Sequence, residues 1–127
     1  MSLLMVLDAS VAFKWYVFDN EKLVELADQL LKRLVNNEIE FHAPELLRYE
    51  LANALYKAQK PSRGRMGRED CEEAYRHFCK LPIKFHRLTN DELQKILEFA
   101  NQFDKSFYDS CYIKLAEILN CKWITEE

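Results

Sequence analysis

The chain has 127 residues, a formal net charge of −3 and 49% hydrophobic residues, which suits one domain with its own core. This composition excludes a disordered chain, and the slightly acidic balance offers no global basic field for nucleic acid. No apolar run approaches the roughly 20 residues that span a bilayer, and no apolar segment behind a basic start marks secretion. We therefore expect no contact with a membrane.

The cysteines form no C-x-x-C pair and have no histidine at zinc-finger spacing. Two of them fall on apolar helical stripes, where cysteine behaves as a small hydrophobic residue. We expect buried, reduced thiols, which are typical of a cytoplasmic protein. The four residues are Cys71, Cys79, Cys111 and Cys121.

The first half of the chain changes between strand-like and helix-like patterns. Short apolar runs predict strands that are buried on both faces, and apolar residues three or four apart predict helices. The predicted elements are a strand over 3–7, a helix directly after Asp8, a helix over 23–34, a strand over 39–43 and a helix over 45–60 that opens at Pro44.

The second half begins with a loop over 61–68 that holds both glycines. Thr89 and Glu92 fit a capping box, which marks the start of a helix. The predicted elements are a helix over 71–78, a strand over 82–87, a helix over 89–100, a helix over 106–120 and a strand over 121–125.

This order is a strand followed by two helices, repeated three times, with a final strand. Strands that alternate with helices indicate a parallel sheet that is covered by helices on both faces. We predict an α/β fold: a three-layer α/β/α sandwich around a central parallel sheet of about four strands. It forms one domain over residues 1–127.

Four acids lie where a ligand would bind such a sheet. In open α/β sheets the ligand lies beyond the carboxyl ends of the strands. Asp8 follows the first strand, and Glu127 follows the last one after Thr125. Glu50 and Asp109 each interrupt an apolar stretch in the early turns of a predicted helix.

Each acid also has a purely structural explanation. Asp8 or Ser10 could cap the first helix, Ser106 and Asp109 fit a capping box, Glu50 could face solvent, and Glu127 could be a solvated chain end. A cap contributes roughly 1 kcal/mol. Two carboxylates about 4 Å apart repel by roughly 4 kcal/mol at an effective dielectric near 20. If the acids converge, they therefore need a cation or bound protons.

An oxygen-only set of ligands without histidine or cysteine suits Mg²⁺ or Mn²⁺. These ions bind phosphate oxygens and keep several waters, so phosphodiester hydrolysis is the reaction that we predict for a converging set.

Four blocks of the sequence together resemble the PIN domain, and most of all the VapC-type toxins of prokaryotic toxin–antitoxin pairs. They occur in the family's order over nearly the whole chain. The blocks are Val6-Leu-Asp-Ala-Ser-Val11, Ala43-Pro-Glu-Leu-Leu-Arg-Tyr-Glu-Leu-Ala-Asn-Ala-Leu55, Tyr108-Asp-Ser-Cys-Tyr-Ile-Lys-Leu-Ala116 and Trp123-Ile-Thr125.

The resemblance implies an endoribonuclease that depends on Mg²⁺ or Mn²⁺ and leaves a 5′-phosphate and a 3′-hydroxyl. The matching positions imply metal ligands at Asp8, Glu50 and Asp109, with Glu127 in the place of a fourth acid, and supporting roles for Ser10, Asn53 and Thr125. The family usually has an aspartate where Glu127 stands. It also continues with a short basic stretch, a helix and a strand, so we expect a sheet without that last strand.

The resemblance also implies partners. We expect an RNA substrate, a VapB-type antitoxin and a homodimer formed through the helices over 23–34 and 46–55. Arg63, Arg65 and Arg68 form the densest basic cluster and could bind RNA phosphates, or could belong to a solvated loop. The competing hypothesis is a catalytically inactive PIN-like module that binds RNA or protein.

Overall fold

The computed structural model describes residues 2–17, 21–60 and 66–125. Its elements, in chain order, are β1 (Leu3–Leu7), α1 (Ala9–Lys14), α2 (Glu21–Val35), β2 (Ile39–Pro44), α3 (Leu46–Ala58), α4 (Arg68–Cys79), β3 (Lys84–His86), α5 (Asn90–Phe103), α6 (Phe107–Leu119) and β4 (Lys122–Ile124).

The strands form one parallel sheet in the order β3-β2-β1-β4. Met5 of β1 lies opposite Phe41 of β2, and Val6 lies opposite Trp123 of β4. The chain winds from β1 towards β2 and β3, and then returns to the other side of β1. The gap between β1 and β4 is therefore a topological switch point, where open α/β sheets bind ligands.

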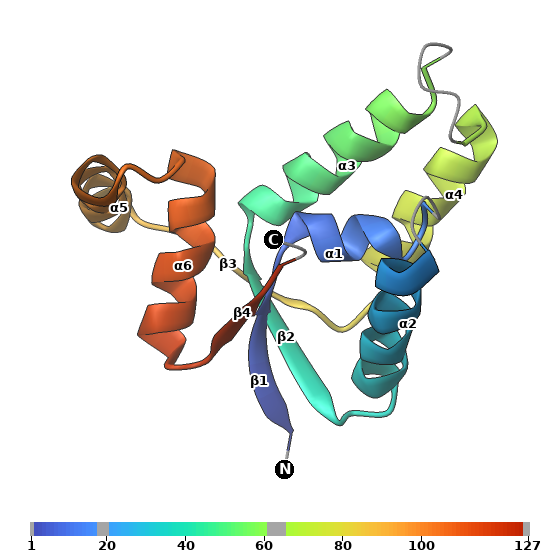
Figure 1. Cartoon of the computed structure of the whole chain (residues 1–127), viewed down its shortest axis with the longest axis horizontal. Helices are drawn as coiled ribbons and strands as arrows, with labels where there is room; N and C mark the ends of the chain where they lie inside the picture. The colour runs from blue at the N-terminus through green and yellow to red at the C-terminus, as the bar shows by residue number, and fades with distance from the viewer. Residues whose placement is uncertain (1, 18–20, 61–65, 126–127) are drawn as a thin grey trace.

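Helices cover both faces of this sheet, which confirms the predicted α/β/α sandwich with four parallel strands (Figure 1). In the view of Figure 1, α5 and α6 lie on one side of the strands and α1, α2 and α4 lie on the other. The helix α6 packs against β1, β2 and β4, whereas α2 packs against β2.

The core sits between the sheet and these helices. Val6, Leu7 and Phe41 are completely buried because their strands have helices on both faces. On α3 the buried residues Leu47, Leu51 and Leu55 recur every fourth position, so one face of this helix enters the core. Glu50 lies beside this face, and α3 thereby holds it next to the sheet.

The start of α3 differs from the prediction, because Pro44 is the last residue of β2 rather than the first residue of the helix. The backbone N–H of Glu45 donates to the carbonyl of His86 at 3.0 Å. The strand ladder thus continues past Pro44 and moves the start of α3 to Leu46. The predicted capping box of Thr89 and Glu92 at the start of α5 is confirmed.

The four cysteines are free thiols, and Cys71 and Cys111 are buried as predicted. The prediction of burial is wrong for Cys79, which is exposed on α4. Cys121 is only half-buried. None of the helices in the described ranges is long and apolar enough to cross a membrane.

Candidate active site

Asp8 occupies the join between β1 and α1, at the carboxyl end of the central strand. It is the N-cap of α1, since its Oδ2 accepts a hydrogen bond from the backbone N–H of Ser10 at 3.0 Å. The Ser10 hydroxyl donates to the same oxygen. Asp8 is only 8% exposed. The prediction of a cap is confirmed, but burial and a second donor exceed what a cap requires.

Thr125 joins this group from the other end of the chain. The sheet places β4 beside β1, and the backbone N–H of Asp8 donates to the carbonyl of Ile124 at 3.1 Å. The Thr125 hydroxyl lies 3.4 Å from Asp8 Oδ2 and also 3.4 Å from Ser10 Oγ. Ser10 and Thr125 thus both contact one oxygen of Asp8, which holds the carboxylate in place.

Glu50 is held from the opposite face of the sheet by Tyr112, a residue whose contribution the sequence did not predict. The Tyr112 hydroxyl of α6 donates to Glu50 Oε1 of α3 at 2.6 Å. Tyr112 is 1% exposed, so this bond lies at the border of the core. The sequence feature that could have indicated this role is the position of Tyr112 three residues after Asp109, which places both side chains on one face of the helix.

The surroundings of Glu50 disfavour its negative charge. Burial raises the pKa of Glu50 above its usual range, and the negative charges of Asp8 and Asp109 raise it further, against the hydrogen bond from Tyr112. Burial and the Glu50 carboxylate also raise the pKa of the Tyr112 hydroxyl. None of the ion pairs between described residues involves these acids. The structure therefore gathers negative charge at this edge of the sheet.

The other predicted site residues have different surroundings. Asp109 lies in the first turn of α6, where its backbone N–H donates to Ser106 Oγ at 3.1 Å. Asn53 is exposed on α3, one turn after Glu50. Arg68 is exposed at the start of α4 and pairs with Glu72. Glu127, Arg63 and Arg65 lie outside the described residues.

This donor set fits a hard divalent cation by its chemistry. In the hydrogen bonds described above, each carboxylate uses one oxygen, which is Oδ2 in Asp8 and Oε1 in Glu50. Across the described part of the chain, no three acids, histidines or cysteines lie close enough to form a complete metal site. Mg²⁺ keeps several waters and often binds through one or two carboxylates, so a complete protein cage is not required.

A second polar cluster lies on β2 and β3. Nδ1 of His42 and Nε2 of His86 are 2.7 Å apart, and Nε2 of His42 lies 3.1 Å from Oε1 of Glu40. Lys84 pairs with the same Glu40 oxygen. His42 is 7% exposed, so the two imidazole rings lie side by side at the border of the core.

This histidine pair predicts a loss of stability in mild acid. Burial and the neighbouring His42 lower the pKa of His86 below its ordinary value of about 6.5. As the pH falls, the unfolded chain therefore binds more protons at His86 than the folded chain does. The contribution of His86 to the free energy of unfolding is fully present above about pH 6.5 and is lost as pH drops through the lowered pKa. We expect the melting temperature of His86→Asn to vary less between pH 7 and 5 than that of the wild type. A matching change in His77→Asn, which alters an exposed histidine of α4, would contradict this assignment.

Fold and site together define a doubly wound α/β protein with an acidic site at the switch point of its sheet. The chain belongs to the PIN domain family, because the family model of the PIN domain matches residues 5–127. This confirms the family that the sequence predicted.

Known relatives extend the likeness to VapC proteins. Exonuclease VapC9 of Pyrobaculum aerophilum is 30% identical over 112 residues, which are 88% of this chain and 80% of that protein. The fold is similar to the crystal structure of VapC20 from Mycobacterium tuberculosis, a Sarcin-Ricin loop cleaving toxin. The TM-score between the two structures is 0.70 at 12% identity, over 92% of this chain and 84% of that one. The fold is also similar to that of VapBC2 from Rickettsia felis, whose structure is bound to a DNA fragment from the promoter. The TM-score between the two structures is 0.64 at 10% identity, over 98% of this chain and 88% of that one.

Proposed function

We propose that this protein is a VapC-type endoribonuclease that depends on Mg²⁺ or Mn²⁺ and leaves 5′-phosphate and 3′-hydroxyl ends. The observation that carries the proposal is the placement of Asp8 and Glu50 at the carboxyl edge of the sheet, where hydroxyl donors hold one oxygen of each carboxylate. Burial, together with the nearby charges of Asp8 and Asp109, raises the pKa of Glu50 there. Folded proteins seldom gather carboxylates without a cation. The likeness to a protein named as a nuclease supports the same reaction class.

In this proposal the carboxylates coordinate a divalent metal ion, and hydroxyl groups orient the carboxylates. Asp8, Glu50 and Asp109 would bind it, with Glu127 as a fourth ligand. A divalent ion bound there would offset the charge of the phosphate and make a nucleophilic water available at neutral pH. Ser10 and Thr125 orient Asp8, and Tyr112 orients Glu50, as the partners of metal ligands commonly do.

The partners follow from the same family. We propose an RNA substrate whose phosphates contact Arg63, Arg65 and Arg68. A VapB-type antitoxin is supported by the fold shared with VapBC2. A homodimer formed through α2 and α3 would cover exposed apolar side chains such as Leu26 of α2. Free thiols suit the reducing cytoplasm, where we place the protein.

The name of the relative VapC9 specifies an exonuclease, whereas we propose internal cleavage. A circular RNA separates these activities, because it has no end for an exonuclease to attack. We expect the wild type to open circular RNA in Mn²⁺ or Mg²⁺ and to leave it intact in chelator. Mapping of the new ends should find a 5′-phosphate and a 3′-hydroxyl. Degradation of linear RNA alone would contradict the endonuclease.

A second candidate function is a PIN-like module that binds RNA or protein without cleaving it. It is favoured by the lack of a three-ligand metal cluster among the described residues. This hypothesis predicts that RNA stays intact in the assay above and that its affinity is the same with Mn²⁺ and with chelator.

A further inference from the structure

A mostly apolar hollow of about 270 Å³ lies where α3, α5 and α6 begin, at the carboxyl ends of β2 and β3. In Figure 1, α3 begins directly above β2, and α6 lies beside the sheet. Aliphatic and aromatic side chains line the hollow, and Glu45, His86 and Arg87 add polar groups. The apolar lining includes Leu46, Tyr49, Leu93, Phe107, Tyr108 and Cys111.

Two tyrosines distinguish this hollow from an ordinary gap in the core. Tyr49 is 73% exposed and Tyr108 is 57% exposed, so their rings remain available at the surface. Tyr49 directly precedes Glu50, and Tyr108 directly precedes Asp109. Neighbouring residues on a helix point about 100° apart, so each helix turns an acid towards the site and a tyrosine towards the hollow beside it.

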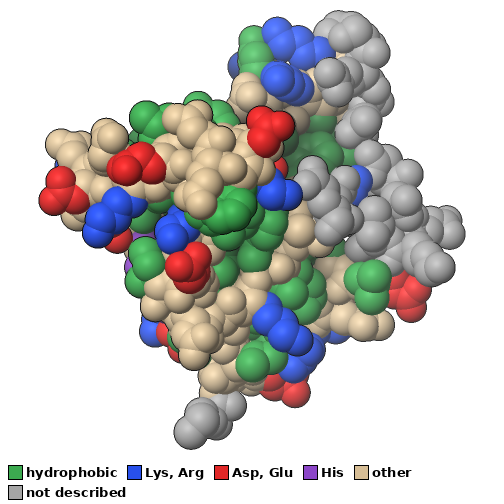
Figure 2. Space-filling view, turned by 60° about the vertical axis from the view of Figure 1, so that its left-hand side comes forward, with side chains coloured by type: hydrophobic (Ala, Val, Ile, Leu, Met, Phe, Trp, Pro, Cys, Tyr) green, Lys and Arg blue, Asp and Glu red, His purple; other side chains and the backbone are tan. Residues whose placement is uncertain are grey.

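The hollow also borders the two helices that carry Glu50 and Asp109. Leu46 and Tyr49 line it from α3, and Tyr108 and Cys111 line it from α6. A phosphate held at the acids would therefore place an adjacent nucleotide close to Tyr49 and Tyr108. Exposed apolar, acidic and basic side chains intermingle on the side that carries α5 and α6 (Figure 2).

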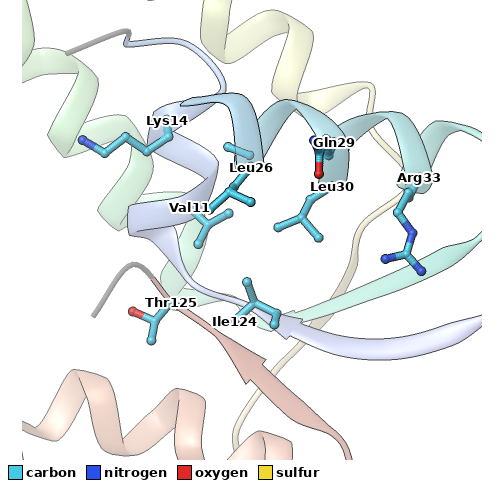
Figure 3. A pocket seen from close by; sticks show the side chains of 9 residues that line it. Val11, Lys14, Leu26, Gln29, Leu30, Arg33, Ile124 and Thr125 are labelled. Carbon is cyan, nitrogen blue, oxygen red and sulfur yellow. The ribbon is translucent and has the colours of Figure 1, made fainter. Parts of the chain in front are cut away.

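A second apolar hollow has no aromatic side chain in its lining, although Thr125 connects it with Asp8. It lies between α1, α2 and the end of β4, and its apolar side chains are Val11, Leu26, Ala27, Leu30 and Ile124 (Figure 3). None of the residues that line it is aromatic. It therefore offers no ring on which a base could stack.

We propose that the hollow beside Tyr49 and Tyr108 binds one base of single-stranded RNA next to the scissile phosphate. This inference rests on the proposed ribonuclease function and adds a base-binding subsite to it. Proteins read single-stranded RNA by splaying bases out and stacking them on aromatic side chains. The volume is near the lower end for small-ligand sites, about 300 Å³, which suits one base rather than a folded RNA. Arg87, His86 and Glu45 supply polar groups that could meet the base edge or its phosphate.

Binding of short RNA tests this subsite without any need for cleavage. Oligoribonucleotides with a central 2-aminopurine, flanked by each of the four bases in turn, would be titrated with the full chain carrying Asp8→Asn in Mg²⁺. Stacking quenches 2-aminopurine fluorescence. We expect quenching on binding, and we expect Tyr49→Ala and Tyr108→Ala each to weaken binding roughly 5- to 100-fold, as loss of one stacked aromatic does. Tyr49→Phe and Tyr108→Phe should keep both quenching and affinity, because the ring remains.

Tyr56→Ala is the matched control, since Tyr56 is a 52% exposed tyrosine of the same helix that does not line the hollow. Binding without quenching, or equal affinity of the alanine variants and the wild type, would overturn the subsite. So would unchanged RNA affinity together with a shift from dimer to monomer in sedimentation, because the tyrosines would then form a protein interface. Quenching with Asp8→Asn, together with a wild type that cuts no RNA in Mn²⁺ or Mg²⁺, would instead sink the nuclease and leave the subsite standing.

Discussion

Replacement of Asp8 by asparagine is expected to lower kcat/KM for RNA cleavage by at least about 100-fold. Loss of a group that merely orients a metal ligand costs about 10- to 100-fold, and loss of the ligand itself costs more. Asparagine keeps an oxygen that can accept from Ser10 and Thr125, but it carries no charge to attract a cation.

The same substitution should leave the fold intact. Asparagine caps helices about as well as aspartate does, so α1 keeps its N-cap. We expect the melting temperature in chelator to be no lower than that of the wild type. Asp91→Asn is the control, because Asp91 is an exposed acid in the first turn of α5. Cleavage at the wild-type rate by Asp8→Asn would exclude Asp8 from the chemistry, and unfolding would point to a structural role.

Glu50→Gln should make the metal-free protein more stable while it removes activity. The pKa of Glu50 is raised in the folded state, so the folded protein favours the protonated carboxyl group. This contribution is complete below the unfolded pKa, near 4.3, and is lost as pH rises through the raised folded pKa. At pH 7 the charged group therefore costs stability, and glutamine imitates the protonated form while still accepting from Tyr112.

We expect a gain of about 1 kcal/mol at pH 7 in chelator, a value that allows for solvent screening of a half-buried group. In a chain of this size that corresponds to a rise in melting temperature of about 4 °C. The gain should vanish near pH 4, where the wild-type carboxyl group is protonated as well. Glu98→Gln, on the exposed side of α5, should change little.

Metal should reverse this order of stability. Mn²⁺ at about 100 times its Kd stabilises a protein that binds it only when folded by about 2.7 kcal/mol. The wild type should gain that amount, and Glu50→Gln should gain less because it has lost a ligand charge. Equal stabilisation of both proteins by Mn²⁺ would show that Glu50 does not contribute to the metal site.

Local patterns in the sequence were sufficient for the fold. The apolar run over 3–7 identified a strand, which is buried in its last three residues and exposed at Leu3, and Thr89 with Glu92 marked the start of α5. Such features depend on neighbours within one helical turn or one strand, so they can be read without a partner. The start of α3 was misjudged by two residues because a hydrogen bond from Glu45 to His86 extends the strand ladder. That bond joins two strands, and no local pattern contains it.

The sequence by itself therefore determined the class of fold, the family and the acids worth testing. It presented each acid with a local explanation, and Asp8 was as good a helix cap as a ligand. Only the tertiary structure decided that Thr125 contacts Asp8 across 117 positions and that Tyr112 holds Glu50 across 62. The reason is physical: parallel strands are joined by long helical crossovers, so the residues that meet at their carboxyl ends are remote in sequence.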